Sequence, residues 1–347
     1  MRAAVLLLVI AGMGYRQVVW LLGILFHVEI SKSSLQRWVG EIAGQLPGFE
    51  KMIKLLNEKR PITEGHLDEM FPRGTDDCVL VLKDGHGRIL ASQAVGKRDE
   101  ETVKPFLQRI GDTGIRLKSF YTDGCRAYFN AIRAVFGDTV NIQYDYFHII
   151  QNAWRHLRKW ATEHRRDVKR RSENVSTPWY KKRLTELAKN LWDNRYLVFK
   201  SEKNMTEEEK ELPAEVVGSD QKIGDLRAFL GGIWNIFEDS RDEREAMEAL
   251  EKLKEMKTDR KNPVPFRKVT EFMEKHFRWM TAFLRCENVR RNSLAETSMR
   301  VLRRLEIAHD GFRSDKGRED FLRIYQAVRY LGWNIYDPPE LMEIQDE

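Results

Sequence analysis

The feature that most constrains the fold is a change of pattern near residue 148. Residues 63–146 contain short apolar runs separated by turns and by two amphipathic segments, whereas residues 150–285 are charged and helical in pattern, with no convincing strand. Such a chain needs a sheet completed before residue 150, followed by a largely helical body. With 347 residues, of which 42% are hydrophobic, both parts can bury a core, and general disorder is excluded.

The first part predicts an α/β fold built on a mixed five-stranded sheet. The turn Asp84-Gly85-His86-Gly87 joins the second and third strands into a hairpin. Three antiparallel strands followed by helix-linked parallel strands place the first and fourth strands side by side at the centre. The expected strands are 65–71, 78–83, 88–95, 115–122 and 139–146, and the expected helices are 99–111 and 127–136.

The N-terminal residues 1–45 predict a small helix-turn-helix domain. Three short helices are expected, the third beginning at an N-cap Ser31 and burying one face. The polar face of this third helix carries Lys32, Ser33, Gln36 and Arg37. The alternative is a helical cap on the next domain. A signal peptide at residues 2–10 is disfavoured because no A-x-A-like cleavage site follows. The apolar run is too interrupted for a membrane span, which needs about 20 apolar residues. Residues 46–62 are interpreted as a linker.

Residues 150–285 predict an all-helical insertion with breaks near 172–177, 201–220 and 258–265. Its aromatic residues at helical spacing are interpreted as core. The tryptophans concerned are Trp154, Trp160, Trp179, Trp192, Trp234 and Trp279. Residues 286–335 then predict two helices that return to the first domain, at 293–307 and around Phe321–Leu331, before a tail at 336–347.

Charge and cysteine content favour a protein of a reducing compartment that binds a polyanion. The net charge is +6, which is mildly basic. The three cysteines are odd in number and widely spaced, at Cys78, Cys125 and Cys286. They form neither a disulfide framework nor a CxxC metal motif, so a reducing, cytoplasmic location is expected. A nucleic-acid partner would make the protein nucleoid-associated.

Three acidic residues stand out by position. Asp68 lies in the first strand, Asp123 ends the fourth strand, and Glu296 lies on the first C-terminal helix. Three converging carboxylates are the minimal set of ligands for two hard divalent ions about 3.5–4 Å apart. Two ions at this separation can catalyse phosphodiester cleavage. Each residue also has a structural interpretation: Asp-Gly after a strand is a common turn, and a helix glutamate usually lies in solvent.

Five segments in order resemble the DDE transposases of insertion sequences, whose catalytic domain is RNase H-like. They are HLDEMFPRG (66–74), VLVLKDGHGRILASQAVGKRDEETVKPFL (79–107), YTDGCRAYFNAI (121–132), YDYFHIIQNAW (144–154) and NSLAETSMRVLRRLEIAHDGFRSDKGREDFL (292–322). The fourth is similar to the Asp/Cys-x-x-His signature of the Mutator-like branch, with Asp145 and His148 as the pair. The helical stretch before Glu296 resembles the all-helical insertion of that branch.

The resemblance implies that Asp68, Asp123 and Glu296 are catalytic residues holding two Mg²⁺ ions, with Mn²⁺ as a substitute. It also raises an active-site role for His148, against the alternative of a packed core histidine. Asp84 competes with Asp68 as first ligand, but its hairpin setting disfavours it. Glu287 and Glu306 compete with Glu296, whose neighbours match the family context better.

Basic side chains define the expected DNA surface. Phosphate contacts give sequence-independent affinity. On the third N-terminal helix the candidate DNA contacts are Lys32, Ser33, Gln36 and Arg37, and of these Gln36 and Arg37 suit base reading in a major groove. The remaining candidates are Arg155, Arg158 and Lys159 after His148, and Arg300, Arg303 and Arg304 beside Glu296. The alternative for each is a solvated helix face.

The predicted function is a transposase that binds the terminal inverted repeats of its own element and catalyses metal-dependent DNA cleavage and strand transfer. The resemblance implies at least a dimer on DNA, because two ends must be paired, and no membrane association is expected. Two alternatives stay open: a decayed or domesticated transposase that only binds DNA, and an RNase H-like nuclease without strand transfer. An upstream DNA-binding portion is also compatible with a chain that begins within a helical pattern.

Overall fold

The computed structural model describes residues 2–71, 78–256, 263–285 and 314–334. The chain divides into two compact units. Unit 1 comprises residues 1–145 and 291–347, and unit 2 comprises residues 146–290. The boundary of unit 2 lies close to the predicted insertion at 150–285. No helix within the described ranges is long and apolar enough to cross a membrane.

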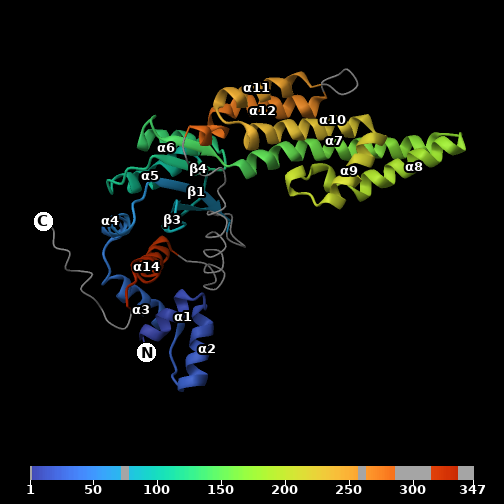
Figure 1. Cartoon of the computed structure of the whole chain (residues 1–347). Helices are drawn as coiled ribbons and strands as arrows, with labels where there is room; N and C mark the ends of the chain where they lie inside the picture. Colours follow the sequence, from blue (N-terminus) through green and yellow to red (C-terminus); the bar gives the residue numbers. More distant parts are fainter. Residues whose placement is uncertain (1, 72–77, 257–262, 286–313, 335–347) are drawn as a thin grey trace. The chain divides into compact units, whose positions relative to one another are not determined.

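Unit 1 is a five-stranded mixed sheet with helices on both faces (Figure 1). Its strand order is β3-β2-β1-β4-β5, with β1 antiparallel to β2, β2 antiparallel to β3, and β4 parallel to both β1 and β5. The prediction of neighbouring first and fourth strands is therefore confirmed. The strands are β1 (Glu64–Met70), β2 (Cys78–Asp84), β3 (Ile89–Val95), β4 (Ser119–Thr122) and β5 (Asn141–Tyr144).

The helices of unit 1 divide between the two faces of this sheet. Phe120 of β4 packs on Phe136 of α6, with ring centroids 4.9 Å apart, and α5 packs beside α6. On the opposite face Gln326 donates hydrogen bonds to the carbonyls of Ile89 and Leu90 in β3. The helical elements are α1 (Arg2–Ile10), α2 (Tyr15–Phe26), α3 (Lys32–Ala43), α4 (Phe49–Lys59), α5 (Glu100–Gly111), α6 (Arg126–Phe136), α14 (Asp315–Gln326) and η5 (Ala327–Leu331).

The N-terminal helices share one hydrophobic cluster with α14 and the sheet. Val5, Val18 and Leu35 of α1, α2 and α3 lie in it at or below 1% exposure, together with Val81 of β2 and Ile324 of α14. Ser31 caps α3 by accepting a hydrogen bond from the Ser34 amide, as predicted. In this arrangement α1–α3 pack on the remainder of unit 1 as part of its core.

The stretch interpreted as a linker contains a helix. Residues 46–62 include α4, whose Phe49, Met52, Ile53 and Leu56 are buried. Gly48, which suggested a linker, is the N-cap of this helix. The i, i+3, i+4, i+7 spacing of the buried residues is the pattern of an amphipathic helix, and it outweighs the Pro-Gly signal before it.

Two predicted strands are shorter than expected. The strand predicted at 115–122 is β4, which covers only Ser119–Thr122, although Ile115 and Leu117 are buried. The strand predicted at 139–146 is β5, which covers Asn141–Tyr144, because Tyr146 already begins the next helix. Buried apolar residues in a loop that leads into a strand have the same sequence pattern as the strand itself, so the sequence does not separate the two.

Unit 2 is helical throughout its described residues, as predicted. Its core includes Phe229 and Phe266, which stack with centroids 4.2 Å apart. The elements are α7 (Tyr146–Asn174), α8 (Pro178–Asp193), η1 (Leu197–Phe199), η2 (Glu202–Asn204), α9 (Glu207–Ser219), α10 (Gln221–Trp234), η3 (Asn235–Asp239), α11 (Glu243–Glu255), α12 (Val264–Met280) and η4 (Ala282–Leu284).

Two details of unit 2 correct the sequence predictions. The break expected at 201–220 is largely occupied by α9, which Thr206 caps in a capping box with Glu209. Trp179 and Trp192 were expected in the core, but they are 66% and 48% exposed. The buried face of α8 is formed instead by Leu184, Ala188 and Leu191.

Candidate active site

The parallel pairing of β1 and β4 brings two candidate carboxylates to one edge of the sheet. Gly65 and His66 of β1 lie opposite Phe120 and Tyr121 of β4. A Cβ atom at Gly65 would come within 2.7 Å of the Phe120 ring, so glycine permits this close approach. Because the two strands run in the same direction, Asp68 in β1 and Asp123 after β4 both lie toward the carboxyl ends of their strands.

Asp68 shares a face of the sheet with a buried lysine. It lies opposite Val81 of β2, and His66 lies opposite Lys83, so alternation places all four side chains on the same face. Burial lowers the pKa of the Lys83 ammonium to about 7, and the charge of Asp68 opposes this shift. The Asp68 carboxylate also accepts a 2.8 Å hydrogen bond from the Glu69 amide.

Asp123 is held in a tight turn between β4 and α6. Its Oδ1 accepts a hydrogen bond of 3.0 Å from the Cys125 amide. Gly124 between them has φ +85°, in the left-handed region, and a Cβ atom there would overlap the ring of Tyr144. Only glycine fits both the conformation and the space, so the turn geometry of Asp123 depends on it.

Glu69 joins Asp123 in a network of charged groups. Its carboxylate accepts a 2.5 Å hydrogen bond from the Tyr128 hydroxyl and pairs with Arg98, whose guanidinium lies 3.9 Å from Asp123 Oδ2. Burial raises the pKa of Glu69, and the charges of Asp123 and Asp68 add to the increase, while Tyr128 and Arg98 oppose it. Negative charge is therefore concentrated at this edge of the sheet.

This network was not predicted. Glu69 adjoins Asp68 in the HLDEMFPRG segment, which could have drawn attention to it. Arg98 precedes α5 and Tyr128 lies in α6, and no local pattern links either residue to β1. Among the described residues, no three His, Cys, Asp or Glu side chains converge closely enough to hold a metal ion.

Comparison with protein families identifies the chain. Residues 67–316 match the family model DDE_Tnp_ISL3, described as a transposase. The chain belongs to this transposase family. The match begins one residue before Asp68, spans unit 2 and ends within α14, so it covers the positions of Asp68, Asp123 and Glu296. No curated protein matches the chain.

The third acidic candidate of the transposase lies outside the described residues. Glu296 falls within 286–313, as do its competitors Glu287 and Glu306. The candidate DNA contacts Arg300, Arg303 and Arg304 fall there too. The competitor of Asp68, Asp84, is buried in the β2–β3 turn, where it accepts hydrogen bonds from the amides of His86 and Arg88 and from the Arg88 side chain.

Asp145 and His148, the predicted signature pair, differ in burial and in their contacts. Asp145 is 5% exposed, and its amide donates a 2.8 Å hydrogen bond to the carbonyl of Thr122 in β4. His148 lies in the first turn of α7, half-buried, with its ring edge-on to that of Phe147 at 5.7 Å.

The remaining candidate DNA contacts are accessible on two helices of the transposase. On α3, Ser33, Gln36 and Arg37 are exposed, and Lys32 is half-buried. On α7, all three candidates are exposed, namely Arg155, Arg158 and Lys159. Of the 29 residues of α7, eight are basic and three are acidic, so this helix is strongly positive.

Proposed function

We propose that this transposase cleaves and joins DNA with two divalent metal ions held by Asp68, Asp123 and Glu296. The observation that carries the proposal is the parallel pairing of β1 and β4, which puts Asp68 and Asp123 at the same edge of the sheet. Together with the helices on both faces, the strand order supports an RNase H-like catalytic domain.

The donor chemistry at this edge fits Mg²⁺ or Mn²⁺. Carboxylate oxygens are the protein ligands that hard divalent cations prefer. The raised pKa of Glu69 reflects the neighbouring charges of Asp123 and Asp68 as well as burial, and such a negative site favours a cation. When bound, the ions would activate the attacking oxygen and stabilise the leaving oxygen. Arg98 partly neutralises the edge through Glu69 and Asp123.

Two in-line displacements at one site account for transposition. In the first, a water oxygen bonds to the phosphorus at the element end, and the bond from phosphorus to the 3′-oxygen breaks. In the second, the freed 3′-hydroxyl bonds to a target phosphorus, and a target 3′-oxygen leaves. The role of Asp68, Asp123 and Glu296 is to orient the reacting groups. No serine or tyrosine nucleophile is required.

Recognition of the element ends is assigned to the N-terminal helices. The helix-turn-helix proposal rests on α2 and α3, which are joined by a short turn at residues 27–31, and on the exposed Gln36 and Arg37 of α3. Such side chains can reach base edges in a major groove. The basic face of α7 would add phosphate contacts. His148 would contact the DNA near the reacting phosphate, as the Mutator-like Asp-x-x-His resemblance suggests, and pairing of two ends would require at least a dimer.

The test is cleavage and joining of labelled DNA that carries the ends of the element, with Mg²⁺ or with EDTA. Asp123→Asn should abolish nicking and joining while DNA binding persists. Asp138→Asn is a matched control, because the Asp138 side chain is 93% exposed in the turn after α6 and should leave both reactions unchanged.

The outcomes separate the alternatives. Binding of the ends without any cleavage would favour a decayed transposase that acts as a DNA-binding protein. Cleavage without joining, and without preference for the ends, would favour a nuclease. Metal-dependent nicking that Asp123→Asn does not affect would overturn the proposed site.

A further inference from the structure

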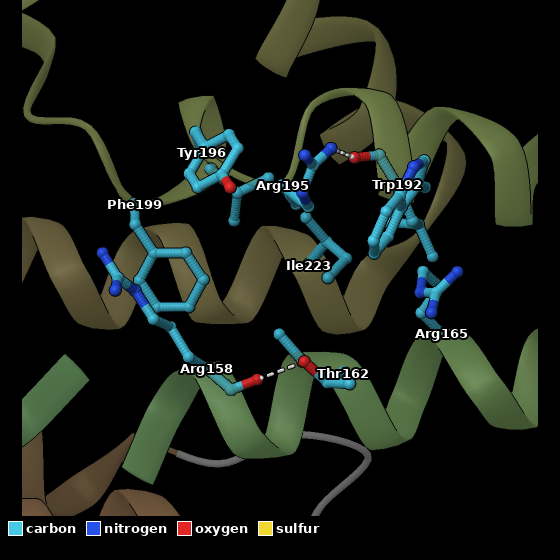
Figure 2. A pocket seen from close by; sticks show the side chains of 11 residues that line it. Arg158, Thr162, Arg165, Trp192, Arg195, Tyr196, Phe199 and Ile223 are labelled. Carbon is cyan, nitrogen blue, oxygen red and sulfur yellow. Dashed lines mark hydrogen bonds between the residues drawn. The ribbon is translucent and has the colours of Figure 1, made fainter. Parts of the chain in front are cut away.

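Unit 2 contains a cavity of about 160 Å³ beside α7 (Figure 2). It lies between α7, the end of α8, the segment that follows α8, and α10. Its apolar lining is buried and includes Leu191, Val198, Phe199 and Ile223. Around this lining stand three arginines and two exposed aromatic rings, namely Arg158, Arg165, Arg195, Trp192 and Tyr196.

The three arginines give the lining of the cavity a positive charge. Within the described part of the chain, no carboxylate lines the cavity, and none of the three guanidinium groups forms an ion pair. Arg195 instead donates a 2.7 Å hydrogen bond to the carbonyl of Trp192. An unbalanced cluster of arginines around a concavity is typical of a site for an anion, and above all for phosphate.

The rings of Trp192 and Tyr196 lie against the guanidinium groups of Arg165 and Arg195 and form flat surfaces beside the cavity. The guanidinium carbons of Arg165 and Arg195 lie 4.5 Å and 4.1 Å from the Trp192 ring centroid, and that of Arg195 lies 4.4 Å from the Tyr196 centroid. Trp192 and Tyr196 are 48% and 68% exposed. Nucleobases bind by stacking on such aromatic and guanidinium planes.

The size of the cavity limits the ligand. Pockets for whole small molecules measure roughly 300–1,000 Å³, so 160 Å³ suits one flat group. A base inside a duplex is stacked and paired, and it cannot enter a cavity unless it leaves the helix. An unpaired nucleotide supplies a flat base that is free to enter the cavity, and its phosphate supplies an anion next to that base for the arginines.

We propose that this cavity binds a single unpaired nucleotide of the DNA substrate. The base stacks on the exposed ring of Tyr196, the outer member of the layer that Tyr196, Arg195 and Trp192 form. The phosphates on its two sides are held by Arg158 and Arg165, which lie at opposite ends of the cavity (Figure 2). The identity of the nucleic acid as DNA rests on the proposed function.

The experiment compares two labelled DNAs bound to the full chain in EDTA, which prevents cleavage. One is a blunt duplex, and the other has the same duplex with a three-nucleotide single-stranded extension containing 2-aminopurine. Fluorescence anisotropy gives the affinities, and 2-aminopurine quenching reports stacking. The extended DNA should bind about tenfold more tightly, as stacking of a base on an aromatic ring supplies.

Tyr196→Ala and Arg165→Ala should remove this preference and the quenching. Both positions have matched controls. Trp179 is an equally exposed aromatic residue on α8 that does not line the cavity, and Arg166 is the exposed neighbour of Arg165. Trp179→Ala and Arg166→Ala should keep the preference. Thermal melting checks the fold, and the high exposure of Tyr196 makes its variant the safer one.

Three results would overturn the inference. The first is equal affinity of the wild-type chain for both DNAs. The second is an equal loss on both DNAs in the cavity variants, which would indicate a phosphate contact only. Cleavage of element ends in Mg²⁺ is scored separately. If the cavity variants lose the preference for the extended DNA but no cleavage is detected, the proposed function is wrong and this inference stands. If the chain cleaves and joins DNA but Tyr196→Ala keeps that preference, this inference is wrong and the proposed function stands.

Discussion

The Tyr128 hydroxyl donates a 2.5 Å hydrogen bond to Oε2 of Glu69 and thereby joins α6 to the carboxyl end of β1. Glu69 adjoins Asp68, and α6 begins three residues after Asp123. The bond therefore links the segments that carry Asp68 and Asp123, two of the three candidate metal ligands. It also offsets part of the effect of burial on Glu69, whose pKa is raised.

Tyr128→Phe should lower the free energy of unfolding by roughly 1.5–3 kcal/mol, because the Glu69 carboxylate loses one of its two side-chain donors, keeping only Arg98, while the ring packing is kept. Urea denaturation at pH 7 measures the change. Tyr180→Phe is the control, since the Tyr180 hydroxyl accepts a 3.1 Å hydrogen bond from Arg171 in an exposed setting. That variant should change stability by less than about 0.5 kcal/mol. Equal effects of the two substitutions would show that the Glu69 contact does not stabilise the fold.

Gly124→Ala should abolish DNA cleavage and destabilise unit 1, because the new Cβ overlaps the Tyr144 ring and displaces the turn that holds Asp123. The cost should exceed the roughly 1–2 kcal/mol of the left-handed conformation alone. Denaturation and the cleavage assay measure the two effects.

Gly114→Ala separates the two contributions. Gly114 has φ +79°, close to that of Gly124, but nothing lies within 4 Å of its Cβ position. Its substitution should cost only the conformational part and leave cleavage intact. If both alanine variants lose the same stability, the contact with Tyr144 is not what selects glycine at position 124.

The sheet was predictable because its order follows from local patterns and from general connection rules. The apolar run Cys78–Lys83, the Asp84–Gly87 turn and the alternation after residue 139 mark the strands. Right-handed, helix-linked parallel connections then leave few arrangements. The adjacency of β1 and β4, and hence the placement of Asp68 and Asp123 at one edge, follows from that order.

The parts that escaped prediction depend on contacts between elements far apart in the sequence. Arg98 and Tyr128 meet Glu69 only after α5 and α6 have packed on the sheet. Trp192 has helical spacing like a core residue, but the neighbouring Leu191 takes the buried position. Neither outcome is decided by the spacing of residues within one helix or strand.

Arg88→Met should destabilise the chain by about 3–5 kcal/mol, because it leaves the buried Asp84 carboxylate without its partner. Arg88 Nε donates to Asp84 at 2.5 Å, and its Nη atoms donate to the carbonyls of Leu56 and Arg60 at 2.7 Å. The substitution thus also detaches α4 from the hairpin.

The double variant Arg88→Met/Asp84→Asn tests the cause of that loss. It removes the buried charge as well and should recover part of the lost stability, measured by urea denaturation. No recovery would mean that the bonds to α4, not the unpaired carboxylate, dominate the effect.

Asp220→Asn should destabilise unit 2 near neutral pH but not in acid. Asp220 caps α10 and accepts a 2.6 Å hydrogen bond from His164. Burial alone would raise the pKa of Asp220, but His164 and two backbone amides outweigh it and hold the pKa below its ordinary 3.8. A lowered pKa contributes stability that is present above 3.8 and is lost as the pH falls through the folded-state value. The difference in unfolding free energy between wild type and Asp220→Asn should therefore be largest above about pH 5 and vanish on acidification.

Asp167→Asn is the control, because it removes only an exposed pair with Arg170, and it should show no such pH dependence. A pH-independent difference for Asp220→Asn would contradict the assignment.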